Sequence, residues 1–148
     1  MNPPLTDVAA RAAELIRDEA VPALGAHYAA GQLLRASLLL QAAAHDFEHG
    51  AAWRVDEIGA LQSLLGGAAP DVDDPTLAAS LRDVAQGPPT DLRISALDAR
   101  LAALHTVLVA LHIWTETSPA PGARRLNTAI WHTLRDGTER RRLAIGHF

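Results

Sequence analysis

Residues 94–115 read ISALDARLAALHTVLVALHIWT, and this stretch decides the fold class. Its apolar side chains recur alternately three and four positions apart, and the pattern runs through Ile94, Leu97, Leu101, Leu104, Leu108, Leu111 and finally Thr115. This spacing places the side chains along one face of an α-helix over about three heptads. We therefore expect a long helix over about 91–117 that packs lengthwise against partner helices.

A second long helix is predicted over about 23–49. Its segment LLRASLLLQAAA, residues 33–44, is apolar on nearly every side, which is typical of a helix surrounded by neighbours. Gly50 is a candidate C-terminal cap, although the helix could also bend and continue. We expect the two long helices to lie side by side in a shared core.

Shorter helices are predicted around these two. Thr6 or Asp7 is a suitable cap for a first helix, which Pro22 would end. Asp74 followed by Pro75 marks the start of another helix. Two further segments follow helical spacing. The first contains Trp53, Glu57, Ile58, Leu61, Leu64 and Leu65, and the second contains Ala123, Leu126, Ile130, Leu134 and Leu143. Strand patterns are nearly missing, so the sequence predicts an all-α, single-domain helical bundle over 1–148, with about five to six helices and two long core helices.

The composition excludes several chemistries. The chain has no cysteine and no lysine, and its 13 basic side chains are all arginine. Disulfides, thiolate metal sites, Schiff-base lysines and a Walker A lysine are therefore impossible. The N-terminus does not resemble a signal peptide, and we expect a cytoplasmic protein. The apolar stretches Leu33–Ala44 and Leu101–Trp114 are too short and too polar to span a bilayer, so no membrane partner is expected.

A metal site is one functional hypothesis. His45 and His49 lie one helical turn apart, as do His112 and Glu116, so each pair could offer two ligands to one ion. Facing helices that bring the pairs together would suit a divalent zinc, iron or manganese ion. The segment HDFEH, residues 45–49, also matches the H-x-x-E-H string of inverted zinc peptidases. The alternative is that these histidines are ordinary polar residues at a helix end and a helix boundary.

Three tryptophans are candidates for a ligand pocket or an interface: Trp53, Trp114 and Trp131. The arginine-rich end, with Arg140, Arg141 and Arg142, could contact phosphates. Nucleic-acid binding is not the expected role, however, because the net charge is −4 and aromatic residues are scarce.

Three segments resemble a family of small all-helical bacterial proteins of unassigned function. They are HDFEHGAAWRVDEIGALQSLL (45–65), DLRISALDARLAALHTVLVALHIWTE (91–116) and AIWHTLRDGTERRRL (129–143). The resemblance implies a bacterial helical scaffold, and it implies no catalytic residues.

The leading hypothesis is a non-enzymatic helical bundle that forms a homodimer and binds a partner protein or a small apolar ligand. No catalytic residues are identified, and no cofactor is expected. One alternative is a metal-binding bundle or metal-dependent enzyme that uses the His/Glu cluster. Another is a nucleic-acid-associated regulator that uses the arginine-rich C-terminus.

Overall fold

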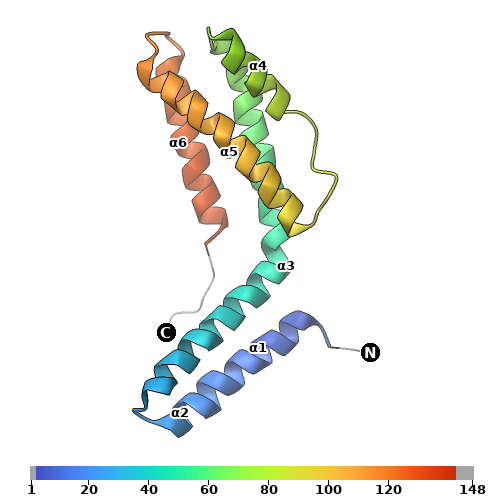
Figure 1. Ribbon diagram of the computed structural model, residues 1–148, viewed down its shortest axis with the longest axis vertical. Helices are drawn as coiled ribbons and strands as arrows, with labels where there is room; N and C mark the ends of the chain where they lie inside the picture. The colour runs from blue at the N-terminus through green and yellow to red at the C-terminus, as the bar shows by residue number, and fades with distance from the viewer. Residues whose placement is uncertain (1–2, 143–148) are drawn as a thin grey trace. The chain divides into compact units, whose positions relative to one another are not determined.

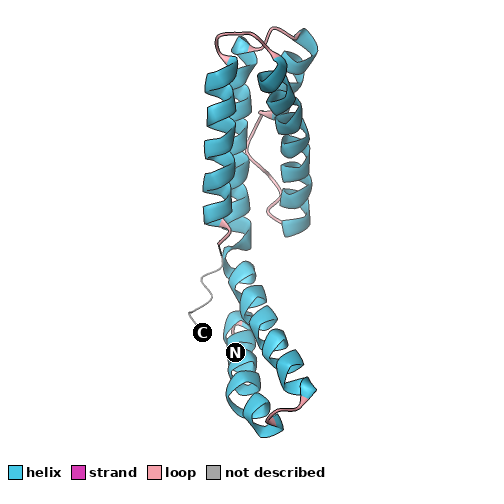
Figure 2. Ribbon diagram, turned by 90° about the vertical axis from the view of Figure 1, so that its left-hand side faces the viewer, coloured by secondary structure: helices cyan, strands magenta, loops and turns pink. Residues whose placement is uncertain are grey.

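The computed structural model describes residues 3–142, and every regular element in that range is helical (Figures 1 and 2). The predicted all-α class with two long helices is confirmed, since α3 has 41 residues and α5 has 24. The elements in chain order are α1 (Leu5–Leu15), the π-helical η1 (Ile16–Ala20), α2 (Val21–Leu24), α3 (Tyr28–Ala68), the 3₁₀-helical η2 (Ala69–Asp71), α4 (Pro75–Val84), α5 (Ile94–Thr117) and α6 (Ala123–Arg140).

Contacts group the chain into two compact units, which we describe separately. The N-terminal unit comprises residues 3–50 of the described range, and the C-terminal unit comprises Ala51–Arg142. Helix α3 contributes residues to both. The grouping does not test whether the chain folds as one domain, so the single-domain assignment stays a prediction.

The N-terminal unit is a helical hairpin in which α1, η1 and α2 lie antiparallel to the first part of α3 (Figures 1 and 2). Pro22 does not end the helical run as predicted, because η1 and α2 continue it without a break to Leu24. The turn comes at Gly25, whose φ of +55° favours glycine. Helix α1 also begins earlier than expected, at Leu5, with no side-chain cap.

The predicted break near residue 50 is absent. The sequence left two possibilities open for Gly50, a cap or a continuation, and the structure has the continuation. The segments predicted as two helices, 23–49 and 53–65, form the single helix α3, which begins only at Tyr28. A glycine costs a helix about 1 kcal/mol relative to alanine, which is too little to end one whose flanking turns are both good helix formers.

The C-terminal unit contains a continuous hydrophobic core. Helix α5 lies between α4 and α6 (Figure 1). Its predicted seam is buried from Leu97 to Thr115, and only the first position, Ile94, is exposed. The core adds Ile58, Leu61, Leu65 and Ala68 from α3, Ala78 and Leu81 from α4, and Leu126 and Ile130 from α6.

The expected packing partner of α5 needs correction. The segments 23–49 and 91–117 were predicted to lie side by side. Among the described residues, however, the core around α5 includes nothing before Ala51. Because α3 does not end at Gly50, its second half is long enough to supply that contact, and the first half belongs to the N-terminal unit.

Two predicted helix starts have different outcomes. Asp74 caps α4 as expected, since its Oδ1 accepts hydrogen bonds from the N–H groups of Thr76 and Leu77 at 2.8 and 3.1 Å. Helix α5 begins at Ile94 rather than near Asp91, whose carboxylate instead accepts the N–H of Arg93. Leu143, predicted as part of the last helix, lies outside the described residues.

Helix α5 is long and apolar enough to cross a bilayer by length and composition alone, with a mean hydropathy of 1.6 over 18 residues. The apolar stretch Leu101–Trp114, which was predicted to be too short to span a bilayer, is shorter than the helix that forms. A core helix passes the same test, and the inner seam of α5 lies in a core, so this finding is weak evidence for a membrane.

Candidate functional site

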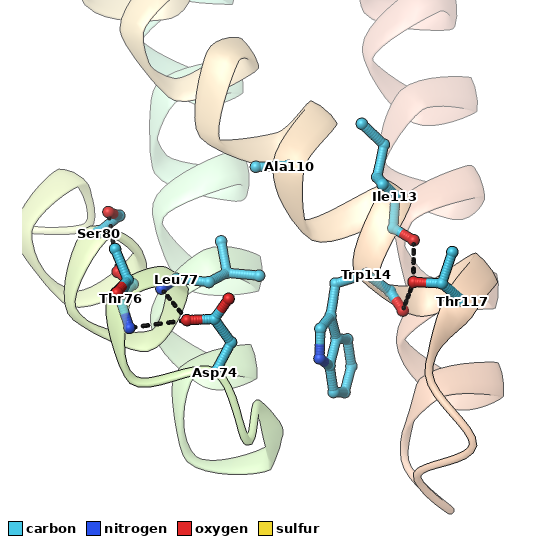
Figure 3. Close-up of a pocket in the computed structure, with 8 residues that line it drawn as sticks. All are labelled: Asp74, Thr76, Leu77, Ser80, Ala110, Ile113, Trp114 and Thr117. Atoms are coloured by element: carbon cyan, nitrogen blue, oxygen red, sulfur yellow. Dashed lines mark hydrogen bonds between the residues drawn. The ribbon is translucent and has the colours of Figure 1, made fainter.

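A groove of about 480 Å³ lies between α4 and α5 in the C-terminal unit. Its apolar wall comes from Leu77 on α4 and from Ala110, Ile113 and Trp114 on α5. Figure 3 shows Leu77 and Asp74 facing the indole of Trp114 across the space between the two helices. The groove therefore combines an aromatic face, aliphatic side chains and a carboxylate at one end.

The indole ring of Trp114 is held in place by a hydrogen bond. Its Nε1–H donates to Oδ1 of Asp73 at 2.9 Å, which satisfies the polar atom of a half-buried tryptophan. Asp73 and Asp74 follow each other just before α4, so the segment that starts the helix also orients the ring. The sequence predicted Trp114 as a ligand or interface residue, and the structure places it in a groove.

The other two predicted tryptophans lie elsewhere. Trp53 is half-buried against the core, and the guanidinium groups of Arg54 and Arg141 lie 4.1 and 5.8 Å from its ring centre. Trp131 is 58% exposed and contacts the ring of His112 edge-on, with the centroids 5.5 Å apart. The structure therefore does not bring the three rings into one pocket, and an interface role for Trp53 and Trp131 stays a prediction.

The predicted histidine pairs both form, each within its own helix. The rings of His45 and His49 are 4.7 Å apart, and Nε2 of His112 is 3.7 Å from Oε1 of Glu116. The first pair belongs to the N-terminal unit and the second to the C-terminal unit. Within residues 3–142 no group of three or more His, Asp or Glu side chains is arranged to hold a metal ion. A four-ligand metal site stays a prediction.

A buried carboxylate that the sequence analysis did not single out joins three helices. The side chain of Glu57 on α3 is 5% exposed, and its oxygens lie 3.5 Å from Nε2 of His105 on α5 and 3.6 Å from Nε of Arg141, the residue that directly follows α6. Within the described part of the chain, Oε2 has no hydrogen bond. Burying a carboxylate costs several kcal/mol, so the nearby arginine is needed to offset that cost.

The backbone of α6 makes room for this carboxylate. Gly137 is buried, and a β-carbon built on it would lie 3.4 Å from Oε1 and 3.5 Å from Cδ of Glu57. The sequence contained a usable signal, because Glu57 falls at helical spacing between the apolar residues Trp53 and Leu61. Among the described residues, the ionisable neighbours of Glu57 include His105 and Arg141, an arrangement typical of a buried structural ion pair.

The arginine-rich end is partly engaged in contacts within the chain. Arg141 lies near Glu57, and its Nε also donates to the carbonyl of Gly137 at 3.2 Å. Arg142 pairs with Glu139 at 3.6 Å on the exposed surface. These contacts reduce the positive charge available to phosphates, but they do not test nucleic-acid binding.

A second feature is the exposed apolar surface of the N-terminal unit. The described residues of this unit bury only Ala13, Ala30, Ser37 and Gly50. Eight large apolar side chains remain exposed there: Leu5, Val8, Leu15, Leu24, Tyr28, Leu34, Leu39 and Phe47. The C-terminal unit, nearly twice as long, exposes five: Leu92, Ile94, Val109, Ile113 and Trp131.

Comparisons with known proteins give no further guidance to function. No protein-family model, no curated protein and no solved structure matches this chain.

Proposed function

We propose that this protein is a non-enzymatic helical protein that self-associates as a homodimer through its N-terminal unit. The observation behind the proposal is the imbalance in that unit, where eight large apolar side chains are exposed and almost nothing larger than alanine is buried. Helices are stable in proteins mainly because an apolar face packs against a neighbour. A hairpin with so small a core needs a further partner.

Part of the exposed apolar surface forms a stripe along each helix of the hairpin. On α1 the exposed Leu5, Val8 and Leu15 share a three-four spacing with the half-buried Ala12, and an apolar groove of about 450 Å³ lies along Val8, Ala12 and Leu15. On α3 the same spacing joins the half-buried Leu40 to the exposed Ala43 and Phe47, while Leu34 and Leu39 lie outside this stripe. At 100° per residue, with Ala13 and Ser37 pointing into the hairpin, both stripes border the same side of it.

The length of the hairpin sets the size of the dimer contact. Two adjacent helices, each about 10 Å wide and about 30 Å long, present about 600 Å² in projection over the full hairpin, and the two stripes cover about half of that length. Two copies that meet along the full hairpin would bury about 1,200 Å², which is the lower limit of specific protein–protein interfaces.

A second copy is the partner that we propose. It presents a hairpin of the same length and the same apolar side, and a two-fold axis would pair the two sides so that each covers the other. The product is a four-helix bundle, which leaves neither apolar side exposed. An unrelated protein would also have to supply a matching pair of apolar helices.

Sedimentation or light scattering provides the test, over about 1 to 100 µM protein. We expect the native chain to have twice its monomer mass of 15.7 kDa. The double variant Val8→Glu/Phe47→Glu places charges in the proposed interface, and we expect it to be a monomer. Both side chains are exposed within one copy, so the variant should keep its helix content by circular dichroism.

The matched control is Val109→Glu, which changes an equally exposed apolar residue of the C-terminal unit. This variant should remain a dimer. A native chain that stays at 15.7 kDa throughout the range, or a dimer lost in Val109→Glu but kept in Val8→Glu/Phe47→Glu, would contradict the proposal.

A further inference from the structure

We infer that the groove between α4 and α5 binds a small organic cation with an apolar body, such as an alkyl- or arylammonium ion. The site is separate from the proposed dimer contact, because all of its residues belong to the C-terminal unit. Its volume of about 480 Å³ falls within the usual range for small-molecule sites, about 300–1,000 Å³. The lining is mainly apolar, as in such sites generally.

The charge at the end of the groove selects a cation. Oδ1 of Asp74 accepts the two hydrogen bonds that cap α4. Its other carboxylate oxygen points away from these bonds, toward the space between the helices (Figure 3). Neither Asp73 nor Asp74 forms an ion pair within residues 3–142, whereas Asp71, Asp91 and Asp98 each pair with an arginine.

The N-terminus of α4 does not cancel this negative charge. A helix start contributes about half a positive elementary charge, and it acts only within the first turn. Asp73 and Asp74 contribute two full negative charges next to it. None of the described residues lining the groove is basic, so an anionic ligand would meet repulsion without a counter-charge.

The indole ring of Trp114 provides a second contact for the cation. An ammonium group or its methyl substituents above an indole face are attracted by the cation–π interaction. The hydrogen bond to Asp73 fixes the orientation of this ring before a ligand arrives, and it increases the negative potential around the ring. Leu77 and Ile113 supply the aliphatic contacts for the apolar part of the ligand.

The polar groups of the groove point to binding rather than to a reaction. The hydroxyl of Ser80 donates to the carbonyl of Thr76 at 3.0 Å, and that of Thr117 donates to the carbonyl of Ile113 at 3.0 Å (Figure 3). Both hydroxyl protons are therefore engaged within their own helices. The lining includes no histidine, and neither of these hydroxyls donates to the carboxylate of Asp74.

The test is an NMR titration of the whole protein with benzyltrimethylammonium. Benzyl alcohol serves as the neutral probe and benzenesulfonate as the anionic probe. We expect saturable shifts of the Trp114 indole N–H and of the amides near Leu77 and Ile113, with the cation binding about tenfold tighter than the alcohol. No saturable shift of these signals by the cation, or equal binding of all three probes, would overturn the inference.

Two variants locate the site and one serves as control. Asp74→Asn keeps a good helix cap but removes the charge, so we expect cation binding to weaken about three- to tenfold. Ala110→Leu fills the groove without changing any charge and should abolish saturation. Asp83→Asn removes an exposed carboxylate of α4 outside the groove and should leave binding unchanged.

If Asp83→Asn weakens binding as much as Asp74→Asn does, the attraction is that of the general surface charge and the inference fails. None of these variants lies in the N-terminal unit, so the mass of the native dimer should not change in any of them. A failed titration would therefore leave the proposed dimer untouched, and a monomeric native chain would leave the groove untouched.

Discussion

The two units of this chain use similar amounts of apolar sequence in different ways. The C-terminal unit packs its leucines inward, and the α5 seam from Leu97 to Leu111 is almost entirely buried. The N-terminal unit has an equally apolar stretch in 33–44, yet Leu39 there is 71% exposed. Composition is therefore not what separates them. The difference is the number of neighbouring helices, because a two-helix hairpin covers only one side of each helix.

The largest expected difference between the two units is in the free energy of unfolding that is lost when a leucine is replaced by alanine. Leu104→Ala in α5 should lower the free energy of unfolding by about 2–5 kcal/mol, because Leu104 is fully buried and a cavity would remain. Leu39→Ala in a monomeric background should change it by less than about 0.5 kcal/mol. Urea denaturation of both variants measures the contrast, and similar losses would show that the N-terminal unit has a core that we have missed.

Replacing a helical glycine by alanine should change the free energy of unfolding by less. The sign of the change depends on whether the new β-carbon has room. A β-carbon at Gly31 in the N-terminal unit or at Gly59 in the C-terminal unit meets no atom within 4 Å. Alanine at Gly59 should therefore stabilise the protein by up to about 1 kcal/mol. We expect Gly31→Ala to give less, because the N-terminal unit opens more easily than the C-terminal core unfolds.

Gly137 is the matched counter-example. Alanine there would crowd the buried carboxylate of Glu57 at 3.4 Å, so we expect no stabilisation or a loss of about 1 kcal/mol. Thermal unfolding of the three alanine variants tests the series. Equal gains at Gly59 and Gly137 would mean that Glu57 moves away without cost.

The smallest expected effect is the contribution of a surface arginine–aspartate ion pair to stability, and it should be the same in both units. Side-chain hydrogen bonds from Arg17 lower the pKa of Asp18, and those from Arg93 lower the pKa of Asp91. A carboxylate with a lowered folded-state pKa stabilises the fold at neutral pH, and that stabilisation is lost as the pH falls through the folded-state pKa. Both pairs lie at the solvent-accessible surface, so each contributes little.

Side-chain NMR titration tests this expectation. Arg17→Gln and Arg93→Gln should each raise the pKa of the paired aspartate toward its ordinary value while leaving the urea midpoint nearly unchanged. A large change of the midpoint in only one unit would show that its ion pair has a structural role that exposure alone does not indicate.

The candidate sites could be predicted from the sequence only in part. Trp114 was identified because a large aromatic in an alanine-rich helix is conspicuous, but its neighbours Leu77 and Asp74 come from a helix 30 to 40 residues earlier in the sequence. Glu57 was hidden among apolar neighbours, and its partners His105 and Arg141 become visible only when α5 and α6 lie against α3. Spacing within one helix predicts which side chains share a face, and it does not predict what that face meets.

The sequence by itself determined the helical class, the seam of α5 and the cap at Asp74, because these depend on periodicity and on contacts within a few residues. Only the tertiary structure decided that Gly50 lies inside a helix, that α5 packs on the second half of α3, and that the first half forms a hairpin with α1, η1 and α2. Those outcomes depend on which apolar faces meet across long sequence separations, and the free-energy differences among such arrangements are not encoded in any one segment.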